Sequence, residues 1–192
     1  MCLLFETIKI LDGKIYNLKF HQKRVNNSGY YLDLSKIIQV PKQYQTGLIK
    51  CKIIYSHELK SISFEPYKFK KIRNIKIIHD DEITYSKKYL NRRKIDDLLA
   101  QNKNYDDILI IKNKLITDSS KANIVFFDGG KWITPASPLL EGTQREKLLK
   151  NKIIAKQEIK IENIKSMKYF MLINAMNEFN PENSCDISVI SF

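Results

Sequence analysis

The apolar residues of this sequence fall in short stretches that end at tight-turn signals, and this pattern restricts the chain to a fold rich in strands. Residues 2–10 are rich in apolar and β-branched types, and Asp12-Gly13 follows them as a hairpin signal. The stretch DILIIK at 107–112 has the composition of a strand that is buried on both faces. Strands are expected over 2–10, 14–16, 48–55, 61–66, 77–79, 107–112, 115–117, 123–127, 131–134 and 169–174.

Three other stretches have the spacing of helices. Asn17 can cap a helix over 18–31, and further helices are expected over 88–101 and 142–151. The mixture predicts an α/β (α+β) chain of two lobes, divided near residue 70, where a basic segment has little core pattern. The expected divisions are a small N-terminal lobe over 1–70, a linker over 71–80 and a larger lobe over 81–192.

Charge limits the classes of partner. The 192 residues include 33 Lys and Arg against 21 Asp and Glu, which gives a net charge of +12. Such a charge could attract a polyanion or a small anion. The lysines alternate with isoleucines along most of the chain, which is typical of solvated faces, and no aromatic and basic motif accompanies them. We therefore expect a small anionic partner and no nucleic acid; an amine on this substrate is implied only by the family resemblance described below.

Other classes are excluded by what the sequence lacks. No apolar run approaches the roughly 20 residues that span a bilayer, and the N-terminal residues do not resemble a signal peptide, so no membrane partner is expected. Three cysteines without a CxxC pair predict no disulfide framework and favour the reducing cytoplasm. Three isolated histidines predict no metal site, and Rossmann, Walker and GxSxG motifs are missing.

What remains is an ordered set of short motifs. They are Phe5-Glu6-Thr7, Lys87-Lys88-Tyr89-Leu90-Asn91-Arg92, Thr117-Asp118-Ser119-Ser120-Lys121-Ala122-Asn123, Leu140-Glu141-Gly142-Thr143-Gln144-Arg145 and Asn174-Ala175-Met176. In order and approximate spacing this set resembles the class IV aminotransferase family of pyridoxal-phosphate enzymes. That family includes branched-chain aminotransferases, D-amino-acid aminotransferases and aminodeoxychorismate lyases. The resemblance implies the fold-type IV architecture, with a β-barrel-like C-terminal lobe, and a homodimer.

The resemblance also implies a cofactor, pyridoxal 5'-phosphate, and a lysine that forms a Schiff base with it. Lys88 aligns with that lysine, and its chemistry needs an amine that can be neutral near pH 7. The neighbouring Lys87 is the competitor, and the family pattern K-x-x-N, completed here by Asn91, favours Lys88.

Further residues align with the family's cofactor-binding positions. Asp118 aligns with the acid that keeps the cofactor's ring nitrogen protonated, where most members carry Glu. Arg24 aligns with an arginine that holds the phosphate. The remaining cofactor-binding residues that the resemblance implies are Asn123, Gly142, Thr143, Gln144, Asn174 and Ala175.

Some positions depart from the family pattern. Gln144 stands where a small hydroxyl residue is common, and Ala175 stands where Thr is common. Thr143 can supply the hydroxyl, and either a backbone N–H or Asn174 can serve beside Ala175.

The reaction stays open between several hypotheses. The stretch KYLNR resembles a KHLNR-type stretch of aminodeoxychorismate lyases, which favours formation of 4-aminobenzoate and pyruvate in the folate pathway. The alternatives are an aminotransferase that acts on branched-chain or D-amino acids, and a family member without catalysis.

Overall fold

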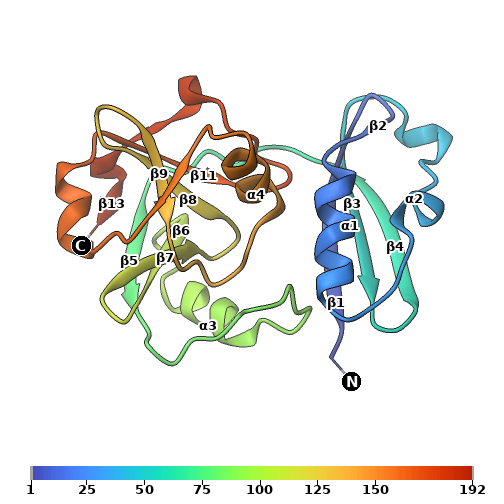
Figure 1. The fold of residues 1–192 in the computed structure, drawn as a ribbon, viewed down its shortest axis with the longest axis horizontal. Helices are drawn as coiled ribbons and strands as arrows, with labels where there is room; N and C mark the ends of the chain where they lie inside the picture. Colours follow the sequence, from blue (N-terminus) through green and yellow to red (C-terminus); the bar gives the residue numbers. More distant parts are fainter. Residues whose placement is uncertain (1, 192) are drawn as a thin grey trace. The chain divides into compact units, whose positions relative to one another are not determined.

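A computed structural model describes residues 2–191, and the chain divides into two compact units (Figure 1). The first unit contains the described residues up to Lys70 together with Lys87–Asn91, and the second contains Lys71–Ser86 and the described residues from Arg92 onward. Each unit has its own sheet, so the expected α/β class is confirmed. The interval 71–80, which we expected to be a linker, contains a strand.

The first unit is a four-stranded antiparallel sheet in the order β2-β1-β3-β4 with short helices on one face. Its elements are β1 (Leu4–Leu11), β2 (Lys14–Ile15), α1 (Leu18–Asn27), α2 (Leu34–Ile37), a 3-10 turn (Lys42–Tyr44), β3 (Leu48–Tyr55) and β4 (Leu59–Pro66). Alternate residues of β1 and β3 form its core together with Val25 of α1 and Leu34 of α2. Asp12 and Gly13 both have positive φ, 47° and 74°, as this hairpin requires.

One edge of β1 receives the segment around Lys88. Because β2 pairs only with the end of β1, the preceding residues have a free edge. The Phe5 N–H donates to the Lys88 carbonyl at 3.0 Å, and the Leu90 N–H donates to the Leu3 carbonyl at 2.9 Å. The expected helix start at Lys88 is therefore wrong, and the helix begins at Arg93. The edge of β1 provides backbone partners that hold this segment extended.

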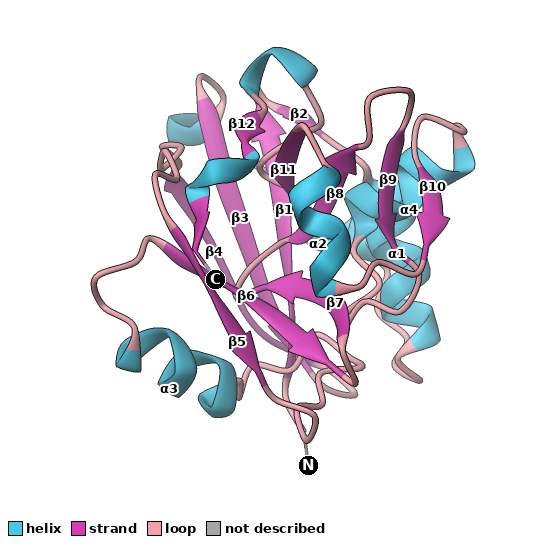
Figure 2. Cartoon of the chain, turned by 90° about the vertical axis from the view of Figure 1, so that its left-hand side faces the viewer, coloured by secondary structure: helices cyan, strands magenta, loops and turns pink. Residues whose placement is uncertain are grey.

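The second unit contains a mixed nine-stranded sheet whose main path is β10-β9-β8-β7-β6-β5-β13 (Figure 2). Its elements are β5 (Ile75–His79), α3 (Arg93–Gln101), β6 (Asp107–Lys112), β7 (Leu115–Ser119), β8 (Asn123–Phe127), β9 (Trp132–Pro135), α4 (Thr143–Lys150), β10 (Ala155–Gln157), a 3-10 turn (Ile161–Ser166), β11 (Tyr169–Ile173), a 3-10 turn (Pro181–Asn183), β12 (Cys185–Asp186), a 3-10 turn (Ile187–Val189) and β13 (Ile190–Ser191). No helix among the described residues is long and apolar enough to cross a bilayer.

Strand β8 is where the second sheet branches. One edge of β8 pairs with β11 along the whole strand. The other edge is shared: Asn123 pairs with Asp118 of β7, and Phe126 and Phe127 pair with β9. Strands β7 and β9 therefore part at the point where Asp118 and Asn123 meet.

The end of helix α1 and the role of Asn17 as its cap differ from expectation. Helix α1 ends at Asn27, before the expected residue 31, and a glycine with positive φ, Gly29, follows it closely. Asn17 precedes α1, but its φ of 56° is left-handed and its side chain makes no capping hydrogen bond. The chain enters α1 directly from the β1–β2 hairpin, which fixes this backbone in place of an extended cap.

Candidate functional site

The residues that the sequence singles out fall into two groups, one in each unit. Arg24 and Lys88 belong to the first unit. Asp118, Asn123, Gly142, Thr143, Gln144, Asn174 and Ala175 belong to the second.

In the first unit, Arg24 is held by a carboxylate from β1. Its Nε and Nη2 donate to the two oxygens of Glu6 at 2.8 and 2.5 Å. Glu6 is fully buried, and it occupies an inward position in a strand whose other inward residues are apolar. This two-point contact fixes the plane of the guanidinium. Glu6 belongs to one of the sequence motifs, but the motif alone assigns it no role. An acidic residue at a position where the alternation of the strand predicts an apolar one is the sequence feature that could have pointed to it.

His21 completes this buried cluster. Its Nδ1 lies 2.5 Å from Glu6 Oε2, and both side chains are inaccessible to solvent. Burial lowers the pKa of His21 and outweighs the attraction of Glu6, so the ring is neutral and donates its Nδ1–H. Burial alone would raise the pKa of Glu6, but Arg24 and His21 together lower it to about 2. The Glu6 carboxylate therefore stays ionised at any physiological pH.

Lys87 and Lys88 have different partners. Lys87 Nζ donates to the Ser28 carbonyl at 3.0 Å. Lys88 Nζ stands 4.6 Å from the centroid of the Phe5 ring, and its charge helps to lower the pKa of His21. Adjacent side chains on an extended segment point to opposite faces, which explains the difference. Of the two, only Lys88 stands over an aromatic ring while its charge also acts on the Glu6 cluster.

In the second unit, Asp118 and Asn123 form a buried hydrogen-bonded pair. Asn123 Nδ2 donates to Asp118 Oδ1 at 2.7 Å and to the Leu140 carbonyl at 2.8 Å. The Leu140 N–H donates to Asp118 Oδ2 at 2.9 Å. Asn123 and Leu140 thus tie β7 and β8 to the loop that precedes α4. Leu140 is a site residue that the sequence reasoning quoted without a role, because backbone donors leave no signature in side-chain chemistry.

The carboxyl of Asp118 is poised between its two protonation states. Burial raises its pKa to about 7, against the hydrogen bonds from Leu140 and Asn123 and the charge of Arg145, which lower it. The amide of Asn123 and the backbone N–H of Leu140, which donate hydrogen bonds to it, are both neutral. A cation brought into contact with this carboxyl would stabilise its ionised form.

Helix α4 begins beside this pair. A Cβ on Gly142 would lie 1.9 Å from Asn123 Oδ1, so only glycine fits there. Thr143 and Gln144 form the buried first turn. The first turn of a helix presents N–H groups without intrahelical acceptors and the positive end of the helix dipole. The start of α4 therefore has the features of an anion-binding helix terminus.

Arg145 is a third residue, after Glu6 and Leu140, to which the sequence motifs assign no role. Its guanidinium is fully buried, and it donates to Glu141 and, at 2.8 Å, to the Pro135 carbonyl. These contacts attach the first turn of α4 to the end of β9. Arg145 follows Glu141 by four residues, and this spacing is the sequence feature that could have predicted their ion pair.

The Asn174-Ala175 turn is organised by the Asn174 side chain. Asn174 Oδ1 accepts from the N–H groups of Met176 and Asn177 at 2.9 and 2.8 Å. Asn174 Nδ2 donates to the Lys121 carbonyl at 3.4 Å, which links the turn to the loop between β7 and β8. Because this side chain is committed to the turn, the backbone is left as the ligand-binding group beside Ala175.

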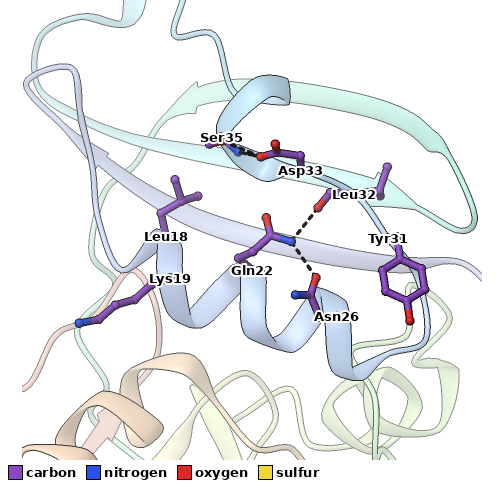
Figure 3. Close-up of a pocket in the computed structure, with 8 residues that line it drawn as sticks. All are labelled: Leu18, Lys19, Gln22, Asn26, Tyr31, Leu32, Asp33 and Ser35. Atoms are coloured by element: carbon purple, nitrogen blue, oxygen red, sulfur yellow. Dashed lines mark hydrogen bonds between the residues drawn. The ribbon is translucent and has the colours of Figure 1, made fainter.

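A groove of about 640 Å³ lies elsewhere on the first unit (Figure 3). It is lined by Leu18, Lys19, Gln22, Asn26, Tyr31, Leu32, Asp33 and Ser35. Gln22 Nε2 donates to Asn26 Oδ1 at 2.9 Å and to the Leu32 carbonyl at 2.8 Å. None of the residues that line this groove is a predicted site residue, and Arg24 uses a different face of α1 to reach Glu6.

The Glu6 cluster predicts a pH-dependent contribution to stability. Replacing Glu6 by Gln leaves Arg24 without its counter-charge, and we expect the free energy of unfolding at pH 7 to fall by about 3 kcal/mol or more. The wild-type advantage is fully present above the ordinary pKa of 4.5 and is lost as the pH falls toward 2. Urea titrations between pH 7 and 3 measure the difference.

The control is Glu65→Gln, because Glu65 is exposed and pairs with Lys50 at the surface. This change should cost less than about 1 kcal/mol. A Glu6→Gln difference that stays constant from pH 7 to 3 would contradict the assignment.

Some known proteins are similar to this chain along most of its length. A protein of Haemophilus influenzae without a functional name is 42% identical over 183 residues, which cover 91% of this chain and 97% of that protein. A solved structure from Haemophilus somnus 129PT, named provisionally as a 4-amino-4-deoxychorismate lyase, is 38% identical. It covers 93% of this chain and 98% of its own, with a TM-score of 0.86.

More distant structures share the fold. A hypothetical aminotransferase from Mycobacterium tuberculosis, solved in a PLP-bound form, is 12% identical, with a TM-score of 0.74. The match covers 98% of this chain and 81% of that one. The sequence pattern of the family described as amino-transferase class IV matches residues 60–184 of this chain. The chain therefore belongs to the class IV aminotransferase family.

Proposed function

We propose that this protein is a pyridoxal-phosphate enzyme that converts 4-amino-4-deoxychorismate into 4-aminobenzoate and pyruvate. The two products together contain all the atoms of the substrate, so the reaction needs no second substrate. The relation to the Haemophilus somnus protein, along almost the whole chain, is the observation that carries the choice of reaction. The stretch Lys88-Tyr89-Leu90-Asn91-Arg92 supports the same choice.

The residues of the second unit fit the ring of this cofactor. Asp118 is a buried carboxyl whose pKa stays raised although hydrogen bonds from neutral donors and the charge of Arg145 oppose the effect of burial, so a cation in direct contact would further favour its ionised form. The protonated ring nitrogen of pyridoxal phosphate is a cation of the required kind. Asp118 would keep that proton in place, and Asn123 and Leu140 would hold Asp118.

The remaining residues fit the phosphate and the amine. The N–H groups at the start of α4 and the backbone of the Asn174-Ala175 turn suit a phosphate dianion. Arg24 supplies a guanidinium whose direction Glu6 fixes. Lys88 supplies the amine that binds the cofactor covalently.

The chemical division of labour follows from these positions. When bound, the cofactor acts as an electron sink for negative charge on the substrate carbon beside the amine. The Lys88 amine would move the proton at that carbon as general base and acid. The tie between the Lys88 segment and β1 limits the motion of this lysine.

The proposal includes a homodimer that works in the cytoplasm. The three cysteines are free, and Cys51 is buried with a pKa raised to about 12, so it is an inert structural thiol. Such cysteines are typical of a reducing compartment.

The reaction can be tested directly. The purified protein with pyridoxal phosphate should form equal amounts of 4-aminobenzoate and pyruvate from 4-amino-4-deoxychorismate, measured by chromatography and a coupled pyruvate assay. Amino acids with 2-oxoglutarate serve as the comparison. Glutamate formation without 4-aminobenzoate would assign the protein to the aminotransferases.

The covalent role of Lys88 has a spectroscopic test. Lys88→Ala should abolish the yellow absorption of the lysine-bound cofactor and reduce the rate by several orders of magnitude, because no amine remains to bind the aldehyde. Lys87→Ala is the matched control and should keep both the colour and the activity. Loss of colour in Lys87→Ala alone would move the assignment by one residue.

The raised pKa of Asp118 predicts that the stability of the protein depends on pH without the cofactor and depends on it less with the cofactor bound. The folded cofactor-free protein holds a proton on Asp118 up to about pH 7, whereas the unfolded chain releases it near pH 3.8. The stability of the cofactor-free protein should therefore fall as the pH rises from about 4 to 7. Asp118→Asn should flatten this slope, as should saturating cofactor in the wild type.

Denaturant titrations at pH 5 and pH 8 measure these slopes. The amide of Asp118→Asn turns an NH₂ group toward a donor, so its absolute stability drops, but that loss does not depend on pH. Equal slopes in the wild type and the variant would contradict the assignment.

A further inference from the structure

The sheet of the first unit has a second face, opposite its core, on which lysines gather. Phe5, Thr7 and Lys9 alternate on β1 with the buried core residues, and Lys50 and Lys52 do the same on β3. In the antiparallel register Thr7 lies opposite Lys52, and Lys9 lies opposite Lys50. Three cationic side chains therefore occupy neighbouring positions on this lysine face.

These lysines differ in how their charges are engaged. Lys50 lies opposite Glu65 of β4 and forms an ion pair with it. That contact is the main reason why the pKa of Glu65 is lowered, and Lys52 contributes least to the shift. The Lys9 ammonium is 4.9 Å from the centroid of the Tyr16 ring and is mostly buried. Lys52 lies opposite Ser63, which carries no charge.

Lys52 and Lys88 share an aromatic ring. Lys52 Nζ is 5.4 Å from the centroid of the Phe5 ring, and Lys88 Nζ is 4.6 Å from the same centroid. Both amines therefore lie near the same apolar ring, and one of them belongs to the candidate catalytic lysine. The ring is only partly buried, so it offers apolar surface to a ligand.

We propose that Lys52 is a specificity-determining residue that binds a carboxylate of the substrate. The ligand class is a six-membered carbon ring with an amine at one end and a carboxylate at the other. The amine lies beside Lys88, the ring packs on Phe5, and the carboxylate accepts a hydrogen bond from Lys52. This inference rests on the proposed role of Lys88, but it does not require the lyase reaction.

The surroundings of Lys52 suit this task. Thr7 and Ser63 flank it in the register and supply hydroxyl donors of the kind that complete a carboxylate site. Lys9 adds positive charge to the same face. Because Glu65 is engaged by Lys50, its negative charge opposes the binding of an anion less than an unpaired carboxylate would.

Equilibrium binding to the cofactor-loaded protein tests the proposal. The probes are 4-aminobenzoate and aniline, which differ by the carboxylate, and calorimetry measures both affinities. In Lys52→Met the Kd for 4-aminobenzoate should rise about 10-fold or more, because a charge-assisted hydrogen bond is lost, while the Kd for aniline stays unchanged. Lys52→Arg keeps the charge and should restore most of the affinity.

The matched control is Lys50→Met, which removes one positive charge two residues away on the same strand. Its Kd for 4-aminobenzoate should rise by no more than about 3-fold, because the change removes no donor to the carboxylate and leaves unpaired only the charge of the exposed Glu65, which solvent screens. An equal loss of affinity for 4-aminobenzoate in Lys52→Met and Lys50→Met would mean that only the positive charge of the surface matters, and it would overturn the proposal. Failure of the wild type to bind 4-aminobenzoate would also overturn it.

The outcome separates this inference from the proposed reaction. Weaker carboxylate binding in Lys52→Met, in a protein that does not produce 4-aminobenzoate, would support the carboxylate site and refute the lyase. Production of 4-aminobenzoate with an unchanged KM in Lys52→Met would support the lyase and refute the carboxylate site. If both hold, the variant should raise KM for 4-amino-4-deoxychorismate more than it lowers kcat.

Discussion

The first unit depends on the contacts of the buried Glu6 carboxylate with Arg24 and His21. This carboxylate places a negative charge inside an apolar core, and this is tolerable only because Arg24 and His21 both bind it. The same bonds join β1 to α1 and fix the direction of the arginine. This contact thus stabilises the core and orients the guanidinium, and the neutral His21 adds a donor without a further charge.

In the second unit the pKa of the buried acid Asp118 is shifted in the opposite direction to that of Glu6. Burial raises the pKa of Asp118, and the hydrogen bonds from neutral groups and the charge of Arg145 offset this only in part. At Glu6 the charge of Arg24 and the hydrogen bonds from Arg24 and His21 outweigh burial, so the pKa of that acid is lowered. A buried acid with a raised pKa, such as Asp118, contributes little to stability. Titratable groups with strongly shifted pKa values are typical of functional sites. The contrast explains why we assign Glu6 to positioning and Asp118 to ligand binding.

Much of the fold could be predicted from local patterns. The alternation of β1 and β3, the Asp12-Gly13 hairpin and the buried strand β6 all follow from the period of side chains and from backbone preferences. The ordered motifs led to the family, because their chemistry is written in side-chain types at short spacing. The sequence by itself determined the strand-rich α/β class, the family and the set of candidate residues.

Only the tertiary structure decided how those residues are held. Lys88 looked like a helix start, but the free edge of β1, far away in the sequence, keeps it extended beside Phe5. Glu6 and Leu140 gained roles that no local pattern shows, because a buried charge and a backbone donor acquire meaning only from their partners. Pairing between distant segments depends on the whole chain, and for that physical reason it lay beyond what the sequence alone could determine.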